Sequence, residues 1–230
     1  MLISNLFQLN NCLFCQIDNA AEFGVCNFCK TILPWITKIK HKCEKCQKEL
    51  TFHEQFICNS CKENTNNFNK IFSIFSYHDP IKKLLLDLKF RQKLTYGDFL
   101  GKILYKFVLQ EWYKHTPLPE TIIPVPLHID RLRSRGFNQA FELSRCISTK
   151  IKINHTSCVR IKNTIKQTSL LKTKRNINIK HAFRCATLPY KHIAILDDIV
   201  TTGGTIKSLC YAIKKNNPQT NIDVWCIARA

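Results

Sequence analysis

The stretch Ala194-Ile-Leu-Asp-Asp-Ile-Val-Thr-Thr-Gly-Gly-Thr-Ile206 indicates the class of fold, because an apolar run passes through two acids into a glycine loop. The run predicts a buried strand that stops at Asp197 and Asp198. After the loop, apolar residues recur at the spacing of a helix: Ile206, Leu209, Cys210 and Ile213. A strand, a tight loop and a helix in this order predict an α/β fold with a ligand site at the carboxyl end of the strand.

The same stretch supplies the parts of a site for a sugar that carries a 5′-phosphate. The loop offers small side chains, hydroxyl groups and backbone N–H groups that can wrap a phosphate: Thr201, Thr202, Gly203, Gly204 and Thr205. The helix that follows points its positive end at the same place. Asp197 and Asp198 can accept hydrogen bonds from vicinal ribose hydroxyls or face a magnesium ion held by the ligand. The structural alternative is an ordinary strand end, where acids cap a Gly-Gly turn.

The composition limits the class of protein. With 230 residues, of which 45% are hydrophobic, the chain can bury a substantial core. No apolar run approaches the roughly 20 residues of a membrane span. Residues 1–16 also lack the basic start of a signal peptide. We therefore predict a cytoplasmic protein without a transmembrane segment.

The charge is uneven along the chain. The formal net charge is +19, and residues 130–184 hold fourteen Lys and Arg but only two acids. This excess predicts an anionic partner larger than one sugar phosphate, such as single-stranded DNA. A solvated basic surface is the alternative. Phe137, Phe141 and Phe183 lie among these charges and could stack on bases, although such residues more often belong to a core.

Eight of the thirteen cysteines form four C-x-x-C pairs before residue 62: Cys12 and Cys15, Cys26 and Cys29, Cys43 and Cys46, Cys58 and Cys61. This internal repeat predicts a double zinc ribbon within residues 1–65, which suits a reducing compartment. Because all four ligands of each site come from the protein, the two Zn²⁺ ions would be structural. We expect their removal to unfold residues 12–61 and to spare the rest of the chain. The spacing leaves open whether the pairs join sequentially or interleave.

A second domain is predicted at residues 70–230, after a polar linker at 62–70. Its predicted strands cover residues 71–77, 121–125, 153–160, 192–197 and 222–228. A helix is predicted to start at Pro80, and others cover 95–114, 137–148 and 204–215. The alternation predicts a mainly parallel sheet flanked by helices.

Two further segments carry groups that suit phosphates. One leaves the strand at 121–125 and delivers guanidinium forks and amides that suit a pyrophosphate: Arg131, Arg133, Arg135, Asn138 and Gln139. The other, at 160–178, is basic and rich in amides, which predicts an exposed loop able to close over a ligand. A solvated basic turn and an ordinary surface loop are the simpler alternatives.

The acid pair and the glycine loop resemble the phosphoribosyl pyrophosphate (PRPP) signature of the type I phosphoribosyltransferases, in which aliphatics, two acids and three spacers precede Thr-Gly-X-Thr. The match runs from Leu196 to Thr205. With the four C-x-x-C pairs, Val125-Pro-Leu127 and Arg135-Gly-Phe-Asn-Gln139, the chain resembles the ComF family of phosphoribosyltransferase-like proteins. A further stretch of that family is matched by Arg160, Thr164, Gln167, Arg175 and Asn176.

The resemblance implies a type I phosphoribosyltransferase core and a role in natural competence, the handling of single-stranded DNA taken up during natural transformation. It implies PRPP with Mg²⁺ as the ligand, and a helicase or other competence proteins as partners. The zinc ribbons could contact DNA or such a partner through Trp35 or through residues 38–48, or they could serve only as structural support.

Three functions stay open. The protein could handle DNA, sense PRPP as a regulator, or be an active enzyme in which a nitrogen acceptor displaces pyrophosphate from C1 of Mg-PRPP. In the enzyme, Asp197 and Asp198 would hold the ribose hydroxyls, and Arg131, Arg133 or Arg135 would hold the leaving pyrophosphate. Similar purine-salvage enzymes carry an acidic base where this chain has Thr201, which argues against a purine acceptor.

Overall fold

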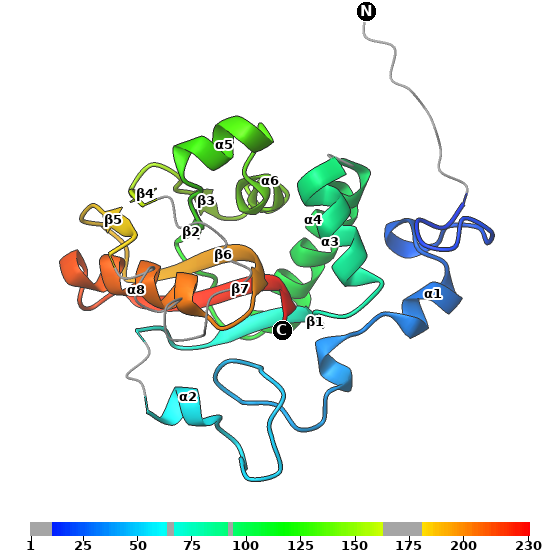
Figure 1. Cartoon of the computed structure of the whole chain (residues 1–230), viewed down its shortest axis with the longest axis horizontal. Helices are drawn as coiled ribbons and strands as arrows, with labels where there is room; N and C mark the ends of the chain where they lie inside the picture. Colours follow the sequence, from blue (N-terminus) through cyan, green and yellow to red (C-terminus); the bar gives the residue numbers. More distant parts are fainter. Residues whose placement is uncertain (1–10, 64–66, 92–93, 163–180) are drawn as a thin grey trace, which may run out of the picture.

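The computed structural model of the chain describes residues 11–63, 67–91, 94–162 and 181–230. Its centre is a parallel sheet of five strands in the order β1-β7-β6-β2-β3 (Figure 1). The strands are β1 (Ile71–Ser76), β2 (Thr121–Pro124), β3 (Lys152–Ile153), β6 (His192–Val200) and β7 (Asn221–Arg229). The predicted α/β class with a parallel sheet is confirmed. No helix in these described ranges is long and apolar enough to cross a membrane.

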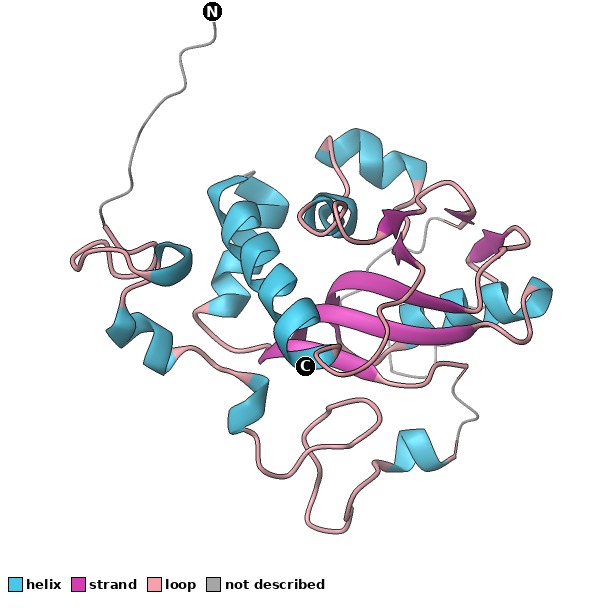
Figure 2. Cartoon of the chain, turned by 180° about the vertical axis from the view of Figure 1, so that it is seen from behind, coloured by secondary structure: helices cyan, strands magenta, loops and turns pink. Residues whose placement is uncertain are grey.

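The side chains of the central strand alternate between two hydrophobic cores, one on each face of the sheet. Ala194 and Leu196 of β6 join the core formed with α3 (Ile81–Arg91), α4 (Leu94–Phe107) and α6 (Gln139–Arg145). Ile193 and Ile195 join the core formed with α8 (Gly204–Asn216). Figure 2 shows the sheet among these helices from behind. Because the strands are parallel, the carboxyl ends of β2, β6 and β7 reach the same edge of the sheet.

Several helix and strand ends differ from the sequence prediction. β6 continues past the acid pair to Val200, because its pairing with β7 continues as far as Arg229. The predicted helix at 95–114 ends at Phe107 and continues as a wider turn, η3 (Val108–Trp112).

A helix also forms where the sequence predicted none. This is α5 (Ile129–Arg135), which ends where Gly136 adopts a φ of 82°. The next helix, α6, starts at Gln139 instead of residue 137, because the side chain of Asn138 accepts hydrogen bonds from the N–H groups of Ala140 and Phe141.

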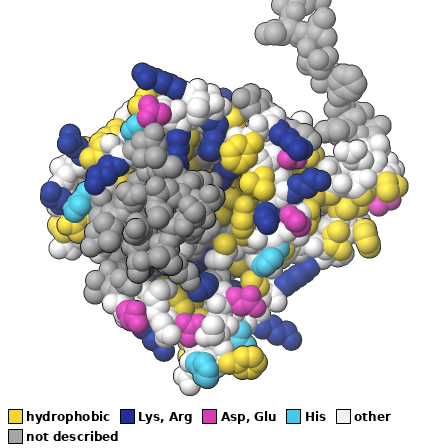
Figure 3. Space-filling model, viewed as in Figure 1, with side chains coloured by type: hydrophobic (Ala, Val, Ile, Leu, Met, Phe, Trp, Pro, Cys, Tyr) yellow, Lys and Arg dark blue, Asp and Glu magenta, His cyan; other side chains and the backbone are white. Residues whose placement is uncertain are grey.

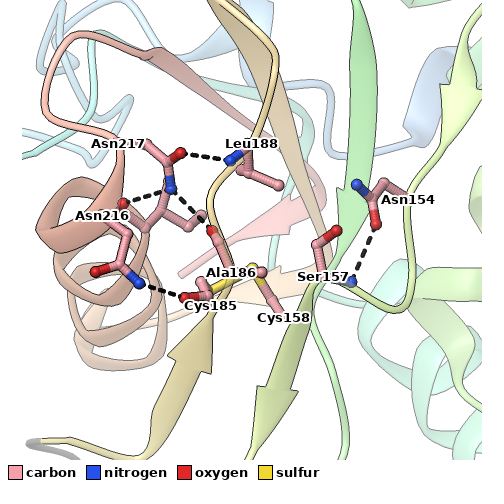
Figure 4. The surroundings of a disulfide bond; sticks show 9 residues. Asn154, Ser157, Cys158, Cys185, Ala186, Leu188, Asn216 and Asn217 are labelled. Atoms are coloured by element: carbon pink, nitrogen blue, oxygen red, sulfur yellow. Dashed lines mark hydrogen bonds between the residues drawn. A yellow bond between two sulfur atoms is a disulfide. The ribbon is translucent and has the colours of Figure 1, made fainter.

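The predicted strand at 153–160 is divided into two. β3 ends the main sheet, whereas β4 (Cys158–Arg160) pairs with β5 (Phe183–Cys185) in a separate antiparallel ribbon. Asn154 breaks the strand, because its Oδ1 accepts a hydrogen bond from Ser157 N at 3.1 Å and turns the chain (Figure 4).

The β4–β5 ribbon is fastened to its surroundings. A disulfide joins Cys158 of β4 to Cys185 of β5. Asn216, at the end of α8, donates a hydrogen bond to the Cys185 carbonyl at 2.7 Å (Figure 4). Asn217 donates to the Ala186 carbonyl at 3.0 Å. The ribbon is therefore held against the end of α8.

The cysteine-rich segment 12–61 covers the outer edge of β1. The segment contains η1 (Glu22–Gly24), α1 (Asn27–Ile32), η2 (Ile36–Lys38) and α2 (Asn59–Lys62). Trp35 forms an antiparallel bridge with Phe75, and Ile71 N donates to the Lys45 carbonyl at 2.8 Å. This cover matters because an open strand edge would pair with other chains.

The cysteine segment shares its hydrophobic packing with the sheet. Cys12, Cys26 and Cys29 belong to the core that contains α3 and α4. Cys43 and Cys46 belong to the core that contains α8. If residues 12–61 unfolded, apolar side chains of both cores would become exposed to water. These shared cores therefore argue against the expectation that residues 12–61 unfold alone when metal is removed.

Candidate functional site

The acid pair lies near the carboxyl end of β6, the central strand of the sheet. Asp198 points toward α3 and forms an ion pair with Lys89. Successive residues of a strand face opposite sides, so Asp197 points toward the side of α8. Its Oδ1 accepts a hydrogen bond from Asp198 N at 2.9 Å. The two carboxyl groups therefore reach the same end of the strand from its two faces.

The two acids differ in their surroundings. Burial, followed by the neighbouring charge of Asp198, raises the pKa of Asp197 to about 8, although the charge of Lys89 acts to lower it. The protonated form of the Asp197 carboxyl group is therefore favoured more than in an ordinary aspartate. A cation bound at this place would favour its ionised form.

The loop after β6 presents hydroxyl and N–H groups at the same edge. Gly203 has a φ of 76° and a ψ of 5°, a left-handed conformation that favours glycine. It is the N-cap of α8 and makes no side-chain capping bond, so the first turn of this 13-residue helix faces the loop with its N–H groups. Thr201 and Thr202 are exposed, and Thr205 is half-buried. The predicted phosphate-binding residues thus lie together.

Two of the three arginines on α5 share one side of the helix. Residues four apart lie on the same face, so Arg131 and Arg135 lie together and are half-buried, whereas Arg133 lies on the opposite side and is exposed. Burial lowers the pKa of Arg135; the charge of Asp198 opposes this shift, and Arg131 adds to it. Of these two arginines, Arg135 interacts electrostatically with the acid pair, through Asp198, and Arg131 lies near Arg135.

A third guanidinium comes from the end of β4. Burial lowers the pKa of Arg160, Arg131 adds to the shift, and Asp197 opposes it, so Arg160 interacts electrostatically with both. The other residues assigned to the closing loop, Thr164, Gln167, Arg175 and Asn176, lie outside the described residues. Closure of that loop stays a prediction.

Asn138 and Gln139 make contacts within the protein. Asn138 caps α6 through Oδ1, and its Nδ2 donates to the Val125 carbonyl at 3.1 Å. Gln139 is buried, and its Oε1 accepts a hydrogen bond from Arg135 at 2.7 Å. Its Nε2 is buried without a hydrogen-bond partner among the described residues. These contacts fix Arg135 and the start of α6 relative to the end of β2.

A cavity of about 520 Å³ opens between α5, α6 and β4, and its lining includes Phe137, Phe141, His155 and Arg160. The rings of Phe141 and His155 meet edge to face, with centroids 5.1 Å apart. Phe183 is buried and belongs to the core on the α8 side. Two of the three phenylalanines considered for base stacking therefore line a cavity, and the third does not.

The eight paired cysteines form two groups in sequential pairing: Cys12, Cys15, Cys26 and Cys29, and Cys43, Cys46, Cys58 and Cys61. We call these the first and second cysteine clusters. The sulfur atoms of each cluster lie within 4.8 Å of one another. This matches the requirement of a tetrahedral site with four sulfur ligands, so each cluster could hold one structural zinc ion.

Backbone N–H groups donate hydrogen bonds to sulfur atoms in both clusters. Cys26 N donates to Cys12 Sγ at 3.3 Å, and Cys58 N donates to Cys43 Sγ at 3.4 Å. Burial acts to raise the pKa of Cys12, but N–H groups of Cys15, Cys26 and Phe14 outweigh it and lower the pKa to about 6. In Cys12 the thiolate, which is the form that binds zinc, is thereby favoured, whereas burial raises the pKa of Cys29 in the same cluster to about 12.

Three residues have roles that the sequence did not reveal. Lys89 neutralises Asp198, although it looks like an ordinary basic residue in the last turn of a helix. Arg229, at the end of β7, is buried and contacts both the loop and the second cysteine cluster. Trp35, considered as a contact for DNA, is half-buried, and its ring lies 4.8 Å from that of Phe75. It is therefore a packing residue.

A parallel α/β sheet with an acid pair and a glycine loop at one carboxyl edge, joined to two four-cysteine clusters, defines the class of this protein. The chain belongs to the ComF family. It is 32% identical to Competence protein F of Haemophilus influenzae, over 98% of this chain and 99% of that protein. It is 29% identical to the DNA utilization protein YhgH of Escherichia coli, over 95% and 96%. Against Competence protein ComFC of Bacillus subtilis it is 25% identical, over 90% and 84%. No protein-family model matches the chain.

Proposed function

We propose that this protein binds PRPP or a related sugar phosphate at the carboxyl end of β6 and acts in natural competence, by handling incoming single-stranded DNA in the cytoplasm. The observation that carries the proposal is the meeting of Asp197 and Asp198 with the Gly203 loop at the end of one strand. The names of the relatives, Competence protein F and DNA utilization protein, support the role in DNA uptake.

The chemistry of the edge supports a sugar phosphate. Ribose hydroxyls would donate to the carboxylates of Asp197 and Asp198, and Mg²⁺ carried by PRPP would find the oxygen ligands it prefers. The phosphate would accept hydrogen bonds from N–H groups of the loop and of the first turn of α8. Bound Mg²⁺ would supply the positive charge that favours ionised Asp197.

The residues around the carboxyl end of β6 support a DNA ligand. The arginines of α5 can neutralise backbone phosphates, and the cavity beside Arg160 has the aromatic walls that an unpaired base requires, from Phe137 and Phe141. Lys and Arg side chains occur around much of the margin of the face shown in Figure 3. In this proposal the sugar-phosphate site binds one nucleotide, and the basic surface contacts the phosphates of the adjoining single-stranded DNA.

A second candidate is an active phosphoribosyltransferase, which is favoured by two arginines whose charges interact with the acid pair, Arg135 with Asp198 and Arg160 with Asp197. The bond from C1 to pyrophosphate would break, a nitrogen acceptor would form the new bond to C1 and lose a proton, and the guanidinium groups would stabilise the pyrophosphate. Thr201 offers no base at neutral pH, so the proton would leave to solvent or to another group. A PRPP-sensing regulator would use the same contacts without turnover.

The test titrates a fluorescent single-stranded oligonucleotide with the full-length protein at near-physiological salt, with and without saturating Mg-PRPP. We expect binding tighter than to a charge-matched polyanion, and a several-fold weakening by Mg-PRPP. The double variant Asp197→Asn with Asp198→Asn should no longer bind Mg-PRPP in calorimetry, because the carboxylates that would accept hydrogen bonds from the ribose hydroxyls are gone. Mg-PRPP should then no longer weaken the binding of DNA. Zinc content should stay unchanged.

The matched control is Asp223→Asn, which alters a buried acid in the amino half of β7 that accepts a hydrogen bond from Tyr113 at 2.6 Å. It should keep Mg-PRPP binding. Unchanged affinity in the double variant would contradict the site. DNA binding equal to that of the polyanion and indifferent to Mg-PRPP would favour the small-molecule enzyme, for which pyrophosphate release with an added nitrogen base is the direct assay.

A further inference from the structure

One buried side chain joins three parts of the chain that lie far apart in the sequence. Arg229 is only 6% exposed. Its guanidinium group donates hydrogen bonds to the carbonyl oxygens of Cys46 and Val200, each at 2.9 Å, and to that of Thr201. Cys46 belongs to the second cysteine cluster, Val200 is the last residue of β6, and Thr201 starts the loop Thr201–Thr205. A direct polar link therefore runs from the cluster to the loop.

The link depends on the shape of the arginine side chain. Nε of Arg229 reaches Cys46 O, Nη1 reaches the loop, and Nη2 lies 3.9 Å from Cys46 Sγ. A planar guanidinium group presents donors in several fixed directions, whereas a lysine ammonium group is a single point of charge. Arginine is thus the one basic side chain that can hold both segments at once.

We infer that Arg229 is a positioning residue through which the second cysteine cluster holds the loop Thr201–Thr205 in its ligand-binding shape. The inference rests on the proposed function for the identity of the ligand, and it adds a means by which the metal state of the cluster regulates that site. Coupling between two sites is reciprocal, so a ligand that orders the loop also holds the second cluster closed. The first cluster packs with α3 and α4 and serves as an internal reference.

The wild-type protein gives the first test. Zinc-loaded full-length protein is treated with a thiol-alkylating reagent and a mild chelator, and the cysteine peptides are followed by mass spectrometry with and without Mg-PRPP. We expect Mg-PRPP to slow alkylation of the second cluster several-fold and to leave the first cluster unchanged. Equal protection of both clusters, or of neither, in a protein that binds Mg-PRPP would overturn the inference.

Arg229→Lys gives the second test, because it keeps the charge and cannot span the two segments. Amide hydrogen exchange of residues 200–206 should become about tenfold faster, since hydrogen bonds from a charged donor are lost. Mg-PRPP should no longer protect the second cluster. The control is Tyr113→Phe, which removes a buried hydrogen bond to Asp223 away from this link. Loop exchange that stays at the wild-type rate in Arg229→Lys, or that accelerates equally in Tyr113→Phe, would refute the link.

The two proposals fail in different ways. If the wild type does not bind Mg-PRPP in calorimetry, the proposed ligand is wrong, and faster loop exchange in Arg229→Lys still supports the link. If Mg-PRPP binds the wild type and Arg229→Lys equally well, and their loops exchange at equal rates, the link is wrong and the proposed function stands.

Discussion

At the scale of single residues, two adjacent carboxyl groups are held in different electrostatic states. Asp198 is neutralised by its ion pair with Lys89, and both side chains are only about a tenth exposed, at 10% and 11%. Asp197 lies on the other face of β6 with its pKa raised to about 8, first by burial and then by the charge of Asp198. Because one acid is paired and the other retains its proton, the same conservative substitution should act in opposite directions on the two.

We predict that Asp197→Asn makes the free energy of unfolding less dependent on pH between about pH 4 and pH 8. A carboxyl group with a raised pKa keeps its proton in the folded protein while the unfolded chain loses it, so the wild type loses stability as pH rises through this window. Relative to the wild type, the variant should gain up to about 1.4 kcal/mol per pH unit. Urea denaturation at pH 5, 6, 7 and 8 measures this, and parallel pH curves for the two proteins would contradict it.

Asp198→Asn is the contrasting variant in the same experiment. It leaves the Lys89 ammonium group buried without its partner, which should lower the free energy of unfolding by about 3 kcal/mol at neutral pH. The acid pair and the loop could be predicted from the sequence, because they form one local motif. The partners of Asp198 and Arg229 could not, because Lys89 and Cys46 come from other elements and only the folded chain brings them close.

At the scale of helices and strands, the contact between α4 and α6 depends on a glycine. A Cβ atom on Gly101 would lie 2.0 Å from Cys146 Sγ and 3.0 Å from Cys146 Cβ. We predict that Gly101→Ala lowers the free energy of unfolding by about 1–3 kcal/mol, because the helices must move apart. Adding Cys146→Ala should recover at least half of the loss, since the nearest atom is then absent. Urea denaturation of the single and double variants measures both effects.

The matched control on the same helix is Gly97→Ala. A Cβ atom there would meet only Leu88 Cδ1, at 3.7 Å, which is an ordinary contact. The higher helix propensity of alanine should make this variant neutral or up to about 1 kcal/mol more stable. Equal destabilisation by Gly97→Ala and Gly101→Ala would show that the loss comes from the backbone of α4 and not from its contact with Cys146.

The elements that the sequence predicted poorly lack a buried, periodic side. In α5, Ile129 and Leu132 are exposed by 49% and 37%, so the helix carries no apolar stripe that a periodicity would reveal. The strand at 153–160 looked continuous, but the hydrogen bond between Asn154 and Ser157 divides it. By contrast, β6, β7 and α8 bury continuous or regularly spaced apolar residues and were predicted to within a few residues.

At the scale of the whole molecule, the C-x-x-C pairs predicted two clusters because each ligand pair is local. The packing of the two clusters against the sheet was not predictable. It depends on contacts such as the bridge between Trp35 and Phe75, whose residues lie in different parts of the chain. As a result, the cysteine segment covers the outer edge of β1 and contributes buried side chains to both hydrophobic cores. Metal binding should therefore bear on the stability of the whole chain.

We predict that metal analysis finds two zinc ions per chain and that stripping both abolishes the single cooperative thermal transition. A structural zinc site contributes about 10–16 kcal/mol in small peptides, which is comparable to the roughly 5–15 kcal/mol that typically stabilises a whole domain. Because the clusters share cores with α3, α4 and α8, the loss should spread into the sheet. Calorimetry with a chelator, against the same chelator saturated with zinc, measures the transition, and hydrogen exchange in β6 shows whether the sheet takes part. A sheet transition that survives chelation unchanged would mean that residues 70–230 fold alone, and a single ion per chain would contradict the paired clusters.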